Sequence, residues 1–278
     1  MKKINRRSFL AAAGLTAAAL ALTACGGSAS STASSTASSA ASSEAASTSA
    51  AAELTTVEAG KLTMATNAAF PPYEMTTDAG EFEGIDIDTA KAIAEKLGLE
   101  LQIDDMDFDA ALLSVQQGKA DIAMAGVTVT DERKAVMDFS DSYATGIQSI
   151  IVPEGSDITS PDDLAGKKIG TQRGTTGYIY CSDDFGDDAV VAYDDGLTAV
   201  QALNNGQVDA VVIDNAPAKE FVAANPGLVI LDTSYAEEDY AIGLAKGSAL
   251  EDAVNAALEE LKADGTLQSI VDKYINAE

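Results

Sequence analysis

The chain has 278 residues, of which 44 are acidic and 17 basic, and it carries a formal net charge of −27 with no histidine. A surface this acidic repels nucleic acid and anionic lipid headgroups, so neither is expected as a partner. The absence of histidine excludes Ser–His–Asp catalysis and histidine-rich metal sites. No motif points to a cofactor or a metal ion, and we predict none.

The N-terminal segment has the pattern of a secretory signal. Several cations precede an apolar stretch, 9–22, that is too short to cross a bilayer comfortably. The stretch ends in Leu-Thr-Ala-Cys25, which resembles the lipobox of bacterial lipoproteins, where the cysteine receives a lipid and cleavage occurs just before it. We therefore predict a signal peptide over 1–24 and lipidation of Cys25, which places the protein outside the cytoplasm on the cell membrane. Residues 6–10 also resemble a twin-arginine signal, so the export route stays open.

A tether is predicted to follow the anchor. Residues 28–52 are almost entirely Ser, Ala and Thr, and such a segment cannot bury enough apolar surface to fold. We interpret 25–53 as the lipidated cysteine and a flexible linker that holds a folded domain away from the membrane.

Beyond the linker, strand-like and helix-like stretches alternate. The order is a strand at 62–66, a helix at 89–97, a strand at 99–103, a helix at 109–117 and a strand at 121–125. Alternation at these lengths predicts an α/β fold with parallel strands and flanking helices.

An internal repeat indicates two similar lobes. Residues 114–124 can be laid over 202–212, so that in each copy a helix, a Gly turn and an Asp precede a buried strand. In this overlay Gly126 falls on Asp214, and each follows the carboxyl end of its strand. Open α/β sheets bind ligands at that end, so a cleft between the lobes is the expected binding site.

Several ordered motifs over residues 60–276 resemble the polar-amino-acid binding proteins of ABC importers, the bacterial extracellular solute-binding proteins of family 3. The motifs are TNAAFPPYE at 66–74, GIDID at 84–88, MDFD at 106–109, AGVTVTDER at 125–133, DFS at 138–140, GTTG at 174–177, DAVVID at 209–214 and LKADGTL at 261–267.

The resemblance implies a periplasmic-binding-protein type II fold, in which two crossing strands join two lobes that close around the ligand. Lobe 1 is then discontinuous, over 54–145 plus 240–278, and encloses lobe 2 over 146–239. The hinge segments are expected at 143–148 and 238–242. The implied partners are a free L-amino acid, the permease subunits of an ABC importer and, through the lipid, the membrane, with the protein acting as a monomer.

The resemblance also implies roles for individual residues. Arg133 would pair with the ligand's α-carboxylate, because its planar guanidinium matches both carboxylate oxygens. Backbone amides at Thr128 and at Thr176, where residues 174–176 open a helix, would complete that cradle. Asp214 would accept the α-ammonium, helped by the Gly126 carbonyl and the Thr128 hydroxyl. Without the resemblance, Arg133 would be interpreted as a surface charge and Asp214 as a helix N-cap.

The remaining implied ligand contacts shape the wall and the far end of the pocket. This set comprises Phe70 and Phe108 as walls, Asn67 and Gln172 near the ligand side chain, and Ala125 and Thr175 beside the residues already named. Neutral amides at Asn67 and Gln172 favour an uncharged polar ligand such as glutamine. Because Glu74 and Asp109 lie near the matched motifs, arginine or lysine stays open.

The alternative functions are an enzyme of the same fold and the sensor domain of a receptor. Some proteins of this fold are dehydratases acting on cyclohexadienyl or arogenate-type amino acids, but an enzyme needs an acid or base at the ligand's ring, and Asp214 is already assigned to the ammonium. A receptor sensor domain would continue into a signalling module. The acidic run at 183–188 does not have the spacing of a calcium loop and is interpreted as a solvated loop. We therefore predict a binding protein and not an enzyme.

Overall fold

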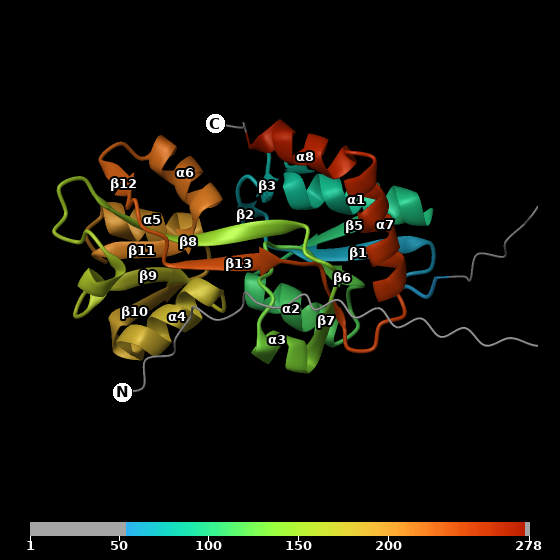
Figure 1. Cartoon of the computed structure of the whole chain (residues 1–278), viewed down its shortest axis with the longest axis horizontal. Helices are drawn as coiled ribbons and strands as arrows, with labels where there is room; N and C mark the ends of the chain where they lie inside the picture. The colour runs from blue at the N-terminus through green and yellow to red at the C-terminus, as the bar shows by residue number, and fades with distance from the viewer. Residues whose placement is uncertain (1–53, 276–278) are drawn as a thin grey trace, which may run out of the picture. The chain divides into compact units, whose positions relative to one another are not determined.

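The computed structural model describes residues 54–275, so the predicted signal peptide, Cys25 and the whole predicted linker lie outside the described part of the chain. The described residues form two α/β lobes (Figure 1). Within 54–275, no helix combines the length and apolar character needed to span a bilayer.

The first lobe is built on a mixed five-stranded sheet of order β5-β1-β6-β14-β7. Strand β1 is parallel to β5 and β6, whereas β14 is antiparallel to β6 and β7. The strands are β1 (Lys61–Thr66), β5 (Glu100–Asp105), β6 (Ile122–Ala123), β7 (Met137–Phe139) and β14 (Gly243–Ala245). A small separate sheet consists of β2 (Ala69–Phe70), β3 (Glu74–Thr76) and β4 (Phe82–Glu83).

The second lobe is built on a six-stranded sheet of order β10-β9-β11-β8-β12, with β13 also paired to β8. Strand β9 is parallel to β10 and β11, and β8 is antiparallel to its neighbours. The strands are β8 (Ala144–Pro153), β9 (Ile169–Gln172), β10 (Val190–Tyr193), β11 (Ala210–Asp214), β12 (Leu228–Ile230) and β13 (Ala236–Tyr240). Strands β8 and β13 run between the two lobes as the crossing pair (Figure 1).

Helices flank both sheets. Those of the first lobe are α1 (Ile85–Leu97), α2 (Phe108–Gln116), α3 (Asp131–Val136), α7 (Glu251–Ala263) and α8 (Thr266–Tyr274). Those of the second lobe are α4 (Thr176–Phe185), α5 (Gly196–Asn204) and α6 (Asn215–Ala224), with short 3-10 turns at Pro161–Leu164 and Asp187–Ala189. The C-terminal α7 and α8 pack against α1, so the end of the chain returns to the first lobe (Figure 1).

The internal repeat has a physical basis in the structure. The turns after α2 and α5 use Gly118 and Gly206 at the same left-handed φ of 66°, which residues with a Cβ rarely adopt. In each lobe the Asp three residues after this Gly accepts from a backbone amide in, or just before, the neighbouring strand. The carboxylate of Asp121 accepts from the amide of Thr63 at 2.8 Å, and that of Asp209 accepts from the amide of Lys168 at 2.8 Å.

Candidate functional site

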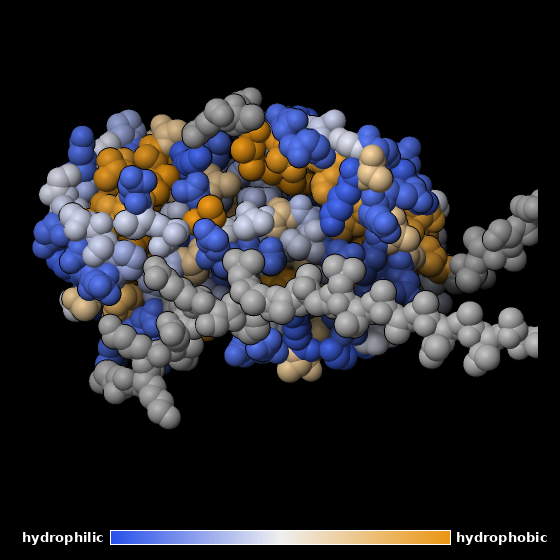
Figure 2. Space-filling view, in the orientation of Figure 1, coloured by the Kyte–Doolittle hydropathy of each residue, from blue (hydrophilic) through white to orange (hydrophobic). Residues whose placement is uncertain are grey.

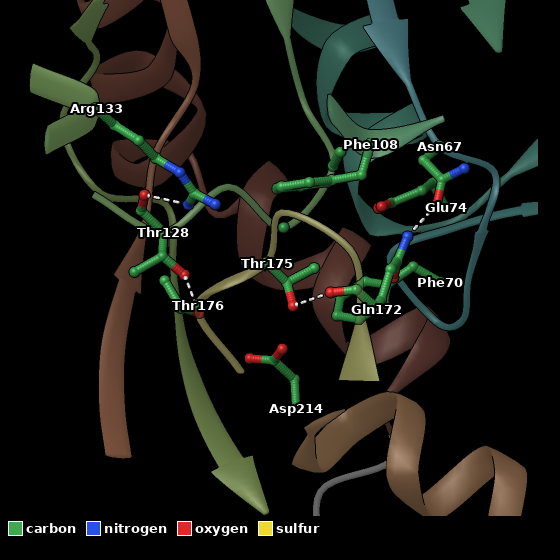
Figure 3. Close-up of a pocket in the computed structure, with 12 residues that line it drawn as sticks. Asn67, Phe70, Glu74, Phe108, Thr128, Arg133, Gln172, Thr175, Thr176 and Asp214 are labelled. Carbon is green, nitrogen blue, oxygen red and sulfur yellow. Dashed lines mark hydrogen bonds between the residues drawn. The ribbon is translucent and has the colours of Figure 1, made fainter. Parts of the chain in front are cut away.

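A pocket is lined by residues at or just past the carboxyl ends of β1, β9 and β11, among them Asn67, Gln172 and Asp214 (Figure 3). Its lining contains all eleven residues predicted as ligand contacts, together with Glu74. They are Asn67, Phe70, Glu74, Phe108, Ala125, Gly126, Thr128, Arg133, Gln172, Thr175, Thr176 and Asp214. The structure therefore brings residues from both lobes into one pocket, and their roles toward a ligand stay predictions.

Arg133 forms the cationic end of this pocket. It lies in the short α3, whose N-cap Thr130 accepts from the Arg133 amide at 3.2 Å. The guanidinium donates to the carbonyl oxygen of Thr128 at 2.7 Å and to that of Gly174 at 3.1 Å, and it lies over the ring of Phe108, 5.3 Å from the centroid. Only 8% of Arg133 is exposed. Burial lowers the pKa of Arg133, but a guanidinium stays charged in proteins, so this end of the pocket is suited to an anion.

Asp214 supplies an anion. It occupies the N-cap position of α6 but makes no side-chain capping bond, so the N-cap interpretation holds for its backbone only. Its carboxylate accepts from Nε2 of Gln148 at 2.8 Å and from the hydroxyl of Tyr240. Burial raises the pKa of Asp214 to about 7, although the bond from Tyr240 opposes that rise. A ligand ammonium would supply the opposite charge that this buried carboxyl lacks.

Glu238 on β13 contacts residues of the site, although no motif predicted a role for it there. Its Oε2 accepts from the hydroxyls of Thr128 at 3.1 Å and Thr176 at 2.9 Å, and from Nε2 of Gln148 at 3.1 Å. The Thr128 hydroxyl, which we expected to help with the ammonium, is thus used by Glu238. Because Thr128 and Thr176 come from different lobes, Glu238 joins the two lobes through the crossing strand.

The helix opening offers the Thr176 amide that the predicted carboxylate cradle requires. Thr176 is the first residue of α4, so its amide is among those that a helix cannot bond internally. Thr175 is the N-cap, where its hydroxyl donates to the carbonyl of Gln172 at 2.8 Å and accepts from the amide of Tyr178 at 3.4 Å. Thr175 therefore shapes the helix opening as well as lining the pocket.

Aromatic rings and a glycine shape the walls. Phe70 and Phe108 are largely buried, with 7% and 6% of their surface exposed. A Cβ on Gly126 would lie 2.8 Å from the ring of Phe70, and Gly126 has a left-handed φ of 54°, so the wall requires glycine here. Tyr73 is not part of the lining and stacks on Phe70, with 5.8 Å between the ring centroids.

The end of the pocket away from Arg133 is polar (Figure 3). Nε2 of Gln172 donates to Oδ1 of Asn67 at 2.8 Å across the two lobes, and Nδ2 of Asn67 donates to the carbonyl of Met106 at 2.9 Å. Glu74 belongs to the same end and is fully buried. Neither of its carboxyl oxygens accepts from an N–H or hydroxyl donor among residues 54–275, and its carboxyl group faces that of Asp86.

The acidic run at 183–188 is more ordered than the expected loop. Its first half ends α4 and its second half opens a 3-10 turn, and Asp184 accepts from the hydroxyl of Tyr235 at 2.6 Å. In the described part of the chain, no group of three or more acidic or cysteine side chains is arranged to hold a metal ion.

Comparison with known proteins agrees with the fold. Residues 62–277 match the model of the bacterial extracellular solute-binding proteins, family 3, and the chain belongs to this family. A probable histidine-binding protein of Neisseria gonorrhoeae is 32% identical over 99% of this chain and 98% of its own length.

Two solved structures show the same fold. An ancestral arginine-binding protein bound to arginine is 43% identical, with a TM-score of 0.74 over 78% of this chain and 99% of its own. One bound to glutamine is 42% identical, with a TM-score of 0.75 over the same shares. These relatives are binding proteins, so the chain is a solute-binding protein and not an enzyme, and the dehydratase alternative finds no support.

Proposed function

We propose that this chain is the extracytoplasmic substrate-binding component of an ABC importer, and that it closes its two lobes around a free polar amino acid. The observation that carries the proposal is one pocket with a buried Arg133 at one side and a buried Asp214 at another. A zwitterionic ligand would neutralise both, because its carboxylate suits a guanidinium and its ammonium suits a carboxylate. The relatives named for histidine, arginine and glutamine support an amino acid as the ligand.

The ligand side chain would then extend toward the polar end formed by Asn67, Gln172 and Glu74. Both amides are already bonded to each other, which leaves oxygen acceptors on Gln172 and Glu74 to meet donors on the ligand. A terminal carboxamide, ammonium or guanidinium provides such donors. The ligand class is therefore a neutral polar or basic amino acid.

Calorimetry against the free amino acids tests this proposal, using protein that has been unfolded and refolded to remove carried-over ligand. Arg133→Ala should weaken binding by about 2–5 kcal/mol, because the ligand carboxylate would be buried without its partner. Lys134→Ala is the matched control, since it removes an exposed cation from the same helix and should leave affinity unchanged. If no amino acid binds to the wild-type protein, or if both variants bind as it does, the proposal is wrong.

We further propose that the protein reaches its permease as a lipoprotein held by Cys25. A diacylglyceryl cysteine contributes two acyl chains, and two chains anchor stably where one is marginal. Anchoring also raises the effective concentration of the binder near the transporter. Both the lipobox pattern and the extracellular character of the family support the proposal.

Fractionation of expressing cells tests the anchor. Cys25→Ala should move the protein out of the membrane fraction without changing ligand affinity, and Cys181→Ala, a change at the buried second cysteine, should leave it there. Wild-type protein in the soluble fraction, with residues 1–24 still attached, would disprove lipidation.

A further inference from the structure

We propose that Glu74 and Asp86 share one proton beneath the polar end of the pocket, and that a cationic ligand side chain binds by displacing this proton. The pair would thus let one pocket accept a neutral polar side chain while protonated and a guanidinium or ammonium while deprotonated. This inference rests on the proposed function, because it concerns the ligand's side chain in the same pocket.

Glu74 is a buried carboxyl group that receives no hydrogen bond from an N–H or hydroxyl donor in the described part of the chain. Glu74 and Asp86 are both fully buried, and Glu74 also lines the pocket. Oδ2 of Asp86 accepts from the amide of Gly126 at 3.0 Å and from the hydroxyl of Tyr143 at 2.8 Å. Oδ1 of Asp86 and both oxygens of Glu74 receive no hydrogen bond from any other described residue, and the two carboxyl groups lie within hydrogen-bonding reach of each other. A proton between the two carboxyl groups satisfies Oδ1 and one Glu74 oxygen, and leaves the other for the ligand.

The charges around Glu74 require that proton. The ionisable groups that face it are Asp86 on α1, Asp105 at the end of β5, Asp214 at the end of β11, and the phenols Tyr73 and Tyr143, while Arg133 lies at the opposite end of the pocket. Burial first, and the charge of Asp86 second, raise the pKa of Glu74 well above its usual value. Burial also raises the pKa of Asp86 to about 6. Two adjacent buried carboxyl groups cannot both ionise cheaply, so the pair holds a proton near neutral pH.

A ligand cation can replace this proton because it supplies the same charge at the same place. A guanidinium beside Glu74 stabilises the ionised carboxylate, so arginine binding should release the proton to solvent. A neutral amide or urea group gives no such stabilisation, and the pair stays protonated. Affinity for a cationic ligand should therefore rise with pH relative to affinity for a neutral one.

The comparison must remove the contribution of Asp214. Its pKa of about 7 means that the ligand's α-ammonium also releases a proton on binding. L-Arginine and L-citrulline share the α-groups and the chain length, but citrulline ends in a neutral urea. The difference between these two ligands therefore reports the side-chain end of the pocket alone.

The experiment is calorimetry of the ligand-free wild-type protein with L-arginine and L-citrulline between pH 5.5 and 8, in buffers of different ionisation enthalpy. Arginine should release up to about one proton more than citrulline, and the arginine-to-citrulline affinity ratio should rise by up to about tenfold per pH unit as long as the pair in the ligand-free protein keeps its proton. Equal proton release by the two ligands, or a pH-independent ratio, would overturn the inference.

Two variants locate the effect. Glu74→Gln should remove the extra proton release and the pH dependence of the ratio, and should shift the ratio toward citrulline by more than tenfold. Asp109→Asn is the matched control, because Asp109 is an exposed acid near the cleft that does not line the pocket. If Asp109→Asn removes the effect, Glu74 is not its source; if Glu74→Gln does not fold, the wild-type proton counts still decide.

The outcomes separate the two proposals. A wild-type protein that binds glutamine or citrulline but no cationic amino acid across this pH range would overturn the inference and leave the proposed function standing. A protein that binds no free amino acid at all would overturn both.

Discussion

At the scale of single residues, the pocket depends on buried charged groups whose hydrogen-bond partners are neutral. Asp214 receives Gln148 and Tyr240, and Arg133 donates to two carbonyls. Both groups therefore have hydrogen-bond partners, but no opposite charge within residues 54–275 neutralises either of them. A zwitterion would complete both, which is why we expect affinity to depend on these charges more than on the walls.

Asp214→Asn is expected to weaken binding of the amino acid at least tenfold. The substitution replaces a charged acceptor by a neutral amide. The NH2 group of that amide would take the place of one oxygen and would face Gln148 or Tyr240, which are themselves donors. A des-amino analogue of the same ligand lacks the ammonium and should lose little from the substitution. Calorimetry of both ligands on both proteins measures this, and an equal loss would make Asp214 a structural residue.

How well the sequence predicted these residues depends on the kind of information each one carries. Ten of the eleven predicted contacts lie in ordered motifs and Gln172 lies just before one, and all eleven line the pocket. Glu238 has no motif and sits in an acidic run that looks exposed. Its burial follows from strand periodicity, because the alternating pattern of β13 turns Glu238 inward while Glu237 and Asp239 face outward. That pattern has meaning only once the strand is known.

At the scale of elements, positions were predictable and boundaries were not. The helix expected at 89–97 begins at Ile85, directly after Gly84, where an added Cβ would lie 2.1 Å from the Tyr73 carbonyl oxygen. The strand expected at 121–125 pairs only over Ile122–Ala123, and the left-handed Gly126 follows shortly after. Both differences come from tertiary contacts that single-segment patterns do not contain.

Strand direction was also beyond the local pattern. Alternating elements predict parallel neighbours, and β1 with β5 and β9 with β10 follow that rule. Strand β8, which crosses into the second lobe, and strand β14, which follows the return crossing, join their sheets in the antiparallel sense. Local alternation cannot reveal this, because it depends on which sheet the chain rejoins after it crosses between lobes.

At the scale of the whole molecule, the excess of acid has consequences for stability. Hydrophilic side chains are spread over both lobes on the face in Figure 2, as expected for a chain with a net charge of −27. Most acidic side chains reach solvent, but Glu74 and Asp214 in the pocket and Asp86 beside it are buried. Half-buried carboxyl groups paired with cations, such as Asp88 and Asp138, have pKa values lowered below the ordinary 3.8, so they stay ionised above pH 5.

The buried carboxyl groups should therefore control the pH dependence of the ligand-free protein between pH 5 and 7. In the unfolded chain they lose their protons near the ordinary pKa of 3.8, whereas in the folded protein burial raises the pKa of Asp86 to about 6 and that of Asp214 to about 7. Across this window the folded state binds more protons, so their stabilising contribution is full below about pH 4 and is lost as pH rises to about 7.

The free energy of unfolding should accordingly fall with rising pH, by up to about 1.4 kcal/mol per pH unit for each such group. Denaturant titrations of the ligand-free protein at pH 5, 6 and 7 measure the slope. Asp214→Asn should flatten it by up to one group's share, because the amide does not titrate. Asp232→Asn removes the same formal charge from an exposed position and is the control for general repulsion among the acidic side chains. Equal slopes in the two variants would mean that this repulsion, and not burial of Asp214, sets the pH dependence.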